Sequence, residues 1–306
     1  MGSPHISVII PLYNEEDSIT SCLSRLTDIL KPLGSYEVLC INDGSTDQSE
    51  ERLLAFEKTD KHVRHVNFLR NFGHQAALSC GYREVRGNCV ISMDADLQDP
   101  PEVIPQLVAA WEGGAKIVYA KRTTREYDTW FKRTSAGWYY ALLDRLSDTP
   151  IPRDVGDFRL LDRVVVEFIN DLPEQTRFLR GLVAWTGYPS ATITYARAAR
   201  MAGETHYPIT KMLGLAFDGI ISFSLKPLRL ATLLGFWAAG IGIFGIFYAI
   251  IGRLFLPEYW VTGWTALFVG VMFIGGVQLI TIGIIGEYIG KIYKEVQARP
   301  SYITRK

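Results

Sequence analysis

Two long apolar runs near the carboxyl end of the chain restrict its fold more than any other feature. The first runs from Leu228 to about Ile251 with Arg229 as its only charged residue, and the second runs from Trp264 to about Ile285 with none. Each is long enough to cross a bilayer as a helix, which takes roughly 20 residues. A buried helical hairpin in a soluble core is the alternative, but aromatic residues near the ends of both runs favour a membrane hairpin.

The N-terminal half alternates short apolar, β-branched runs with amphipathic segments, which is typical of parallel βαβ units. The predicted strands lie at 6–10, 36–41, 63–68, 89–93 and 116–120, with a helix expected between each pair. Open sheets of this kind bind ligands at the carboxyl ends of their strands. Four loops that follow predicted strands are therefore expected to meet at one edge: 11–15, 43–47, 70–74 and 94–98.

Asp94 and Asp96 follow one of these strands, with Gln98 just beyond, and form an oxygen-rich pattern. Such carboxylates bind Mg²⁺ or Mn²⁺ together with phosphates. In isolation the two acids are more simply explained as helix caps or turn residues. Further acidic and arginine-bearing loops at the same edge favour the metal, because a nucleotide needs acceptors for its ribose and cations for its phosphates.

Several classes of protein are disfavoured by composition and motifs. The chain has 32 basic and 32 acidic residues, which argues against a nucleic-acid partner. No G-x-G-x-x-G follows the first strand and no G-K-[ST] occurs, so a dinucleotide fingerprint and a P-loop are both missing. The cysteines have no paired spacing and are expected to be reduced core thiols: Cys22, Cys40, Cys80 and Cys89.

The middle of the chain is rich in aromatic and basic residues. Aromatic rings interleaved with Lys and Arg at 130–143 suit either a core or a membrane interface. Residues 154–163 are dense in charge around Gly156. Taken alone, this charge is explained by a salt-bridged turn as well as by a functional site. Residues 174–181 are expected to begin a helix, and 193–195 to form a strand.

The predicted organisation is a globular domain at 1–208, an amphipathic interface helix at 209–227, a transmembrane hairpin at 228–288 and a tail at 289–306. Basic residues flank the hairpin on one side, whereas its connecting loop has only Arg253. The positive-inside rule then places the globular domain and the tail in the cytoplasm, as part of an integral membrane protein. The basic residues on that side are Lys226, Arg229, Lys291, Lys294, Arg299, Arg305 and Lys306.

An ordered set of motifs carries a family resemblance over nearly the whole chain. The motifs lie at 8–15, 42–47, 70–75, 93–101, 157–160 and 200–204. The set resembles family 2 glycosyltransferases of the GT-A fold, within them the dolichyl-phosphate-mannose-synthase-like polyisoprenyl-phosphate glycosyltransferases, and most of all the bactoprenol glucosyltransferases. The resemblance implies a Rossmann-like, mostly parallel sheet flanked by helices, followed by amphipathic interface helices and two transmembrane helices.

The resemblance also implies roles for individual residues. Nucleotide-sugar binding is assigned to Pro11, Tyr13, Glu15, Asp43, Asp94 and Ala95. The divalent metal, Mg²⁺ or Mn²⁺, is assigned to Asp94, Asp96 and Gln98, and phosphate binding to Arg122 and Arg200. Asp96 and Asp157 are the expected catalytic residues, with Asp157 near the sugar as a base or as a group that orients it.

The expected reaction is inverting, metal-dependent transfer of a hexose from a nucleotide sugar to polyprenyl (undecaprenyl) phosphate, with UDP-glucose as the best donor. The alternatives are GDP-mannose, UDP-N-acetylglucosamine or a modified pentose as donor, or a non-catalytic membrane adaptor with this fold. A processive synthase is disfavoured, since there is no Q-x-x-R-W segment. A homo-oligomer is also expected, although Gly286 and Gly290 serve packing of the chain's own spans equally well.

Overall fold

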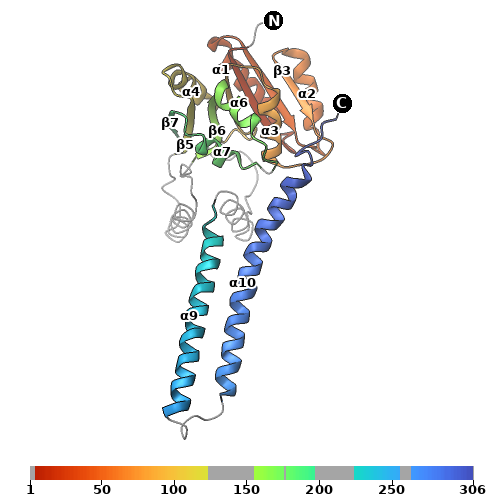
Figure 1. Cartoon of the computed structure of the whole chain (residues 1–306). Helices are drawn as coiled ribbons and strands as arrows, with labels where there is room; N and C mark the ends of the chain where they lie inside the picture. The colour runs from red at the N-terminus through yellow and green to blue at the C-terminus, as the bar shows by residue number, and fades with distance from the viewer. Residues whose placement is uncertain (1–3, 123–154, 176, 197–223, 256–262, 306) are drawn as a thin grey trace.

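A sheet domain carries a pair of long helices that extend from one of its sides (Figure 1). The structure, a computed structural model, describes residues 4–122, 155–175, 177–196, 224–255 and 263–305. Within these residues the strands form one seven-stranded sheet in the order β3-β2-β1-β4-β6-β5-β7. The strands are β1 (Ile6–Leu12), β2 (Tyr36–Asn42), β3 (Val63–Asn67), β4 (Cys89–Ser92), β5 (Ile117–Arg122), β6 (Val155–Asp162) and β7 (Ser190–Tyr195).

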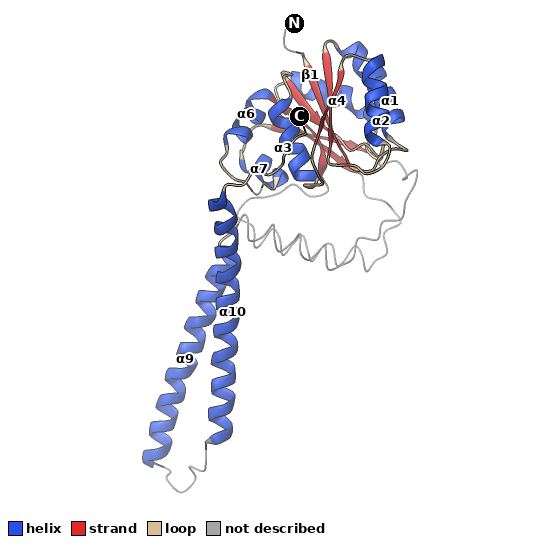
Figure 2. Cartoon of the chain, turned by 90° about the vertical axis from the view of Figure 1, so that its right-hand side faces the viewer, coloured by secondary structure: helices blue, strands red, loops and turns tan. Residues whose placement is uncertain are grey.

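Helices cover both faces of the sheet, as Figure 2 shows from a second direction. The short helices are α1 (Ile19–Leu30), α2 (Ser49–Thr59), α3 (His74–Glu84), α4 (Ile104–Glu112), α6 (Arg163–Asp171) and α7 (Leu179–Trp185), with 3-10 turns η1 (Lys31–Leu33) and η2 (Pro101–Val103). Apolar side chains of α1, α2 and α4 form one core with the sheet, and those of α3, α6 and α7 form a second. The predicted α/β architecture with a mostly parallel sheet is confirmed.

The segment 155–162 is a central strand, so the salt-bridged turn considered for it is wrong. β6 runs antiparallel between β4 and β5. Successive side chains of a strand point to opposite faces, and here Phe158 and Leu160 join the core of α1 and α4. Asp157 and Arg159 lie on the alternate positions, and their mutual ion pair allows both charges to be buried.

The two long helices, α9 (Lys226–Phe255) and α10 (Trp264–Gln297), pack side by side and contain apolar stretches long enough to cross a membrane. Hardly any of either stretch is buried, whereas a core helix of a soluble protein would be mostly buried. The predicted hairpin is therefore present as two apolar helices. Gly286 and Gly290 lie on exposed positions where an added Cβ would meet nothing within 4 Å, so contact between α9 and α10 does not use them.

Some predictions fall outside the described residues. These are the aromatic and basic stretch at 130–143, Arg200, and most of the interface helix predicted at 209–227.

Candidate active site

Four loops at the carboxyl ends of parallel strands meet at one edge of the sheet, as the sequence predicts. The Asn14 amide donates to Ser45 Oγ at 3.0 Å, and the Thr46 amide donates to Asn14 Oδ1 at 2.8 Å. The loops after β1 and β2 are thereby joined directly. Asn14 has a φ of 57°, a left-handed conformation that asparagine tolerates better than most residues. Tyr13, next to it, has 45% of its surface exposed.

Asp43 connects the loop after β2 to the loop after β3. Its carboxylate is 3% exposed and accepts hydrogen bonds from the amides of Phe72, at 2.7 Å, and Gly73, at 2.9 Å. Burial raises the pKa of Asp43, and the two amides partly oppose that shift. Gly44 has a φ of 68°, and a Cβ there would lie 2.5 Å from the Arg70 backbone, so only glycine permits this close approach.

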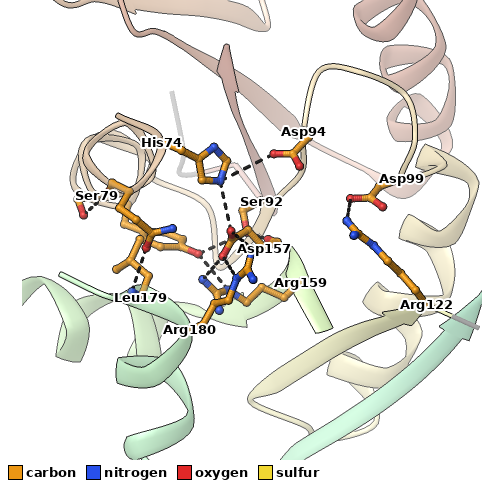
Figure 3. Close-up of polar contacts among 12 residues, drawn as sticks. His74, Ser79, Ser92, Asp94, Asp99, Arg122, Asp157, Arg159, Leu179 and Arg180 are labelled. Carbon is orange, nitrogen blue, oxygen red and sulfur yellow. Dashed lines mark hydrogen bonds and ion pairs between the residues drawn. The ribbon is translucent and has the colours of Figure 1, made fainter. Parts of the chain in front are cut away.

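Asp157 is the centre of a buried charged cluster (Figure 3). Arg180 of α7 donates two hydrogen bonds to its carboxylate, at 2.7 and 3.1 Å, and Arg159 lies 3.3 Å away. His74, the first residue of α3, has its Nε2 3.3 Å from Asp157 and 3.9 Å from Asp94. Asp157 and Arg159 are 5% and 1% exposed, so their charges are balanced almost entirely by one another and by these neighbours.

The environment fixes the charges of this cluster. Burial alone would raise the pKa of Asp157, but the hydrogen bonds from His74 and Arg180 and the charge of Arg159 hold it well below its usual range. Burial likewise opposes the charged form of His74, but the hydrogen bond to Asp157 and the charge of Asp94 raise its pKa above the usual value. The cluster therefore presents an anionic Asp157 among cationic side chains.

The acidic loop after β4 holds Asp94, Ala95, Asp96 and Gln98. Asp94 and Asp96 are partly exposed, while Ala95 and Gln98 are buried. The backbone amide of Gln98 donates a hydrogen bond to Asp96 Oδ1 at 3.1 Å. The intervening Leu97 has a φ of 56°, which is strained for a leucine and shapes the turn that separates the two carboxylates from the buried Gln98.

The residues of this loop fit a divalent cation that substrate phosphates would help to bind. Mg²⁺ is commonly held by one or two protein carboxylates and by phosphate oxygens. Among the described residues no group of three or more His, Cys, Asp or Glu is arranged to hold a metal without such help. Burial and the nearby Asp157, Asp99 and Asp96 raise the pKa of Asp94 to about 6, so a cation here would relieve the repulsion between carboxylates.

Arg122, at the end of β5, lies beside the acidic loop but already has partners. Its Nη2 is 3.2 Å from the buried Asp99, and its Nε donates to the Tyr195 hydroxyl at 3.1 Å. Tyr195 also donates to Asp99. Arg122 thus ties the ends of β5 and β7 to the loop, and phosphate binding by Arg122 stays a prediction.

The sequence predicts the carboxylates of the site and a phosphate role for Arg122 beside them, but it gives no role to His74 or Arg180. His74 and Arg180 are 106 positions apart and belong to α3 and α7, yet both contact Asp157. The signal for His74 was its place in the loop 70–74, which the sequence predicts at the same edge of the sheet. Arg180 lay in a segment that the sequence identified only as the beginning of a helix, so its contact with Asp157 could not be inferred.

The sequence profile of Glycosyl transferase family 2 matches residues 7–169. The chain is 43% identical over 303 residues to the SfII prophage-derived bactoprenol glucosyl transferase of Shigella flexneri, covering 98% of this chain and 97% of the relative. It is 40% identical over 303 residues to the prophage bactoprenol glucosyl transferase homolog of Escherichia coli (strain K12), covering 98% of each.

Solved structures of glucosyl-3-phosphoglycerate synthase from Mycobacterium tuberculosis share the fold. The complex with Mn²⁺, uridine diphosphate and phosphoglyceric acid aligns with a TM-score of 0.50 at 21% identity, covering 71% of this chain and 76% of that one. The complex with Mg²⁺ and uridine diphosphate aligns with a TM-score of 0.50 at 20% identity, covering 71% and 77%. The predicted GT-A fold is confirmed for the sheet domain.

Proposed function

The chain belongs to glycosyl transferase family 2, and we infer from this membership that it transfers glucose from a nucleotide sugar to a polyprenyl phosphate carrier. Relatives that align over nearly the whole chain are named bactoprenol glucosyl transferases. We propose UDP-glucose as the donor and undecaprenyl phosphate as the acceptor, with the product a polyprenyl-phosphate-linked glucose.

One observation supports this function most strongly: the acidic edge of the sheet and an apolar helical hairpin belong to the same chain. β1 begins beside the N terminus, and in Figure 1 the hairpin leaves the domain on the opposite side. The segment after α10 pairs with Asn67 and Leu69, at the carboxyl end of β3. A lipid phosphate held at a bilayer would approach the domain from the side on which the four loops meet.

We propose that Asp43, Tyr13, Glu15 and Pro11 hold the base and ribose of the donor. Asp43 is fixed by two amides, and the exposed ring of Tyr13 is free to cover a base. Ala95 lies in the acidic loop beside the proposed diphosphate. These assignments follow the family motifs and the shared edge of the sheet.

Asp94 and Asp96, with Gln98 at the same loop, would hold Mg²⁺ or Mn²⁺. When bound, such an ion stabilises the negative charge on the leaving diphosphate. His74 lies 3.9 Å from Asp94 of the same loop, and the charge of Arg180 also acts on Asp94. Arg122 and Arg200 are the further proposed phosphate contacts.

The reaction asks little of a general base, because the acceptor phosphate is already an anion near neutral pH. Asp157 suits the task of orienting groups better than that of accepting a proton, since its pKa is held well below the usual range. Docking at the bilayer supplies proximity by bringing the lipid phosphate to the sugar. A single displacement at the anomeric carbon then inverts its configuration.

The charges that flank the hairpin favour a cytoplasmic sheet domain in the cell membrane. A homo-oligomer stays a prediction. The reason for expecting one is that two spans alone bury little surface in lipid.

Replacing Asp96 by Ala tests the proposed catalytic site. Transfer of glucose from UDP-glucose to undecaprenyl phosphate should fall on the order of a hundredfold or more, since charge stabilisation at the leaving group is lost. The variant should keep the thermal unfolding midpoint of the wild type, because Asp96 is partly exposed. Full, metal-dependent activity in Asp96→Ala would contradict the assignment. The matched control is Asp28→Ala, on the exposed side of α1.

A further inference from the structure

The C-terminal segment 299–305 returns from the membrane hairpin to the sheet domain. Ala298 ends α10 in a left-handed conformation with a φ of 47°. The segment then runs antiparallel beside the end of β3, which is an edge strand of the sheet. The Leu69 amide donates to the Ile303 carbonyl at 3.0 Å, and the Arg305 amide donates to the Asn67 carbonyl at 2.7 Å.

Aromatic contacts continue from this segment toward the site. The Tyr302 ring stacks on Phe68, with ring centroids 5.0 Å apart and planes inclined by 8°. Phe68 in turn packs edge-on against Phe72, with centroids 5.8 Å apart. The guanidinium of Arg70 lies 4.1 Å from the centroid of the Phe72 ring.

The backbone of Phe72 and Gly73 connects this series of aromatic contacts to Asp43. The amides of Phe72 and Gly73 are the groups that donate to its carboxylate. Tyr302, Phe68, Phe72 and Asp43 therefore form a continuous path from the end of the chain to the edge of the sheet where the loops meet.

We propose that Tyr302 is a positioning residue for donor binding, because it fixes the loop at 68–73 and, through that loop, Asp43. The inference rests on the proposed function in one respect, the role of Asp43 in holding the nucleotide. A loop held in its bound conformation lowers the ordering cost that a ligand would otherwise meet. The donor site is then complete only when the segment beyond the second apolar helix has returned to β3.

A second contact at the same end of α10 supports this link. Glu295, in the last turn of α10, accepts a hydrogen bond from the backbone amide of Gln175 at 2.8 Å. Gln175 lies shortly before α7, which carries Arg180. The end of the hairpin thus contacts segments that lead to both sides of the site, to Asp43 through Phe72 and to Asp157 through Arg180.

The test compares Tyr302→Ala with Tyr302→Phe in the full-length chain. Loss of the stacked ring should raise the KM for the nucleotide sugar by about tenfold, with kcat changed less than about twofold. Hydrogen exchange at the amides of Phe72 and Gly73 should become faster in the same variant. Tyr302→Phe keeps the stacked ring and should have the wild-type KM and the wild-type exchange rate at these two amides. The matched control is Ile303→Ala, because the Ile303 side chain is 50% exposed in the same segment.

Unchanged exchange at Phe72 and Gly73 in Tyr302→Ala would overturn the proposal, as would a fall in kcat at constant KM. The exchange measurement needs no substrate. If the wild type transferred no sugar, the proposed function would fail, while exchange at these two amides would still decide whether Tyr302 fixes the loop.

Discussion

Asp157 shows how individual side chains set the charge of this site. Its carboxylate contacts Arg180, Arg159 and His74, and it lies in β6, where Arg159 shares its face of the strand and apolar Phe158 and Leu160 lie on the other. Protonation of Asp157 would leave the almost fully buried Arg159 without its countercharge, which is costly. We therefore propose that Asp157 holds these cations in place, and that the anionic state is its working state.

Replacing Asp157 by Asn should lower the free energy of unfolding by about 3–5 kcal/mol, because a buried cation loses its partner. The measurement is thermal or denaturant unfolding of the full-length chain in detergent. Adding Arg159→Met should recover part of the loss, since the unpaired charge is then removed as well. Asp28→Asn, at an exposed pair with Lys31, is the control and should have little effect. Equal stability of Asp157→Asn and wild type would contradict the buried ion pair.

The same carboxylate gives a pH dependence with a defined sign. Its pKa is lower in the folded chain than the unfolded value of about 3.9, so its contribution to stability is complete above that value. The contribution is lost as the pH falls further toward the folded pKa. The difference in unfolding midpoint between wild type and Asp157→Asn should therefore shrink as the pH falls below about 4. A difference that stays constant or grows on acidification would show that the folded pKa is not lowered.

At the scale of single residues, the sequence predicted which carboxylates gather but not how they are neutralised. Asp43 and Asp94 each follow a recognisable strand, and parallel strands bring their carboxyl ends together. His74 and Arg180 could not be assigned in the same way, because contact with Asp157 depends on how α3 and α7 pack on the sheet. That packing comes from apolar contacts spread over the chain, which no local pattern specifies.

At the scale of elements, β6 explains why the charged stretch 155–162 was ambiguous. Strands are usually recognised by apolar residues at every second position, and Phe158 and Leu160 follow that pattern. Asp157 and Arg159 lie on the other face of the strand, and charged residues at such positions normally indicate a face exposed to solvent or a turn. They are buried because Arg180 and Tyr82, from two different helices, complete their contacts.

The contact between α3 and β1 gives a prediction at this scale. A Cβ on Gly81 would lie 2.4 Å from Cγ2 of Ile9, which is fully buried and stiff because it is β-branched. Gly81→Ala should cost about 1–3 kcal/mol from overpacking, which exceeds or offsets the gain of roughly 1 kcal/mol in helix propensity. We expect a lower unfolding midpoint than in Glu84→Ala, an exposed control on the same helix. A higher midpoint in Gly81→Ala would mean that α3 can move away from β1.

At the scale of the whole molecule, the sheet domain and the hairpin were both predictable because each has a simple period or length. Strand and helix alternation specified the first, and two runs of membrane-spanning length specified the second. The return of 299–305 to β3 was not predictable, since so short a segment carries no pattern that predicts which strand it pairs with. Its place follows from the unpaired edge that β3 would otherwise expose.

The orientation of the hairpin can be measured with single cysteines. The native thiols are buried, and burial raises the pKa of Cys22 and Cys89 to about 12, so they should react little with maleimides. In intact cells a membrane-impermeant maleimide should label Glu258→Cys in the connection between the spans. Asp28→Cys, on the sheet domain, should be labelled only after lysis. Labelling of Asp28→Cys in intact cells would contradict a cytoplasmic sheet domain.

Glucose transfer to a lipid phosphate is tested by following radiolabelled sugar into lipid. Full-length protein in liposomes that contain undecaprenyl phosphate is incubated with one radiolabelled donor at a time: UDP-glucose, GDP-mannose or UDP-N-acetylglucosamine. We predict organic-extractable label from UDP-glucose, dependent on Mg²⁺ or Mn²⁺ and absent without the acceptor. Label only from another donor would contradict the assigned sugar, and no labelled lipid with any donor would contradict the transferase itself.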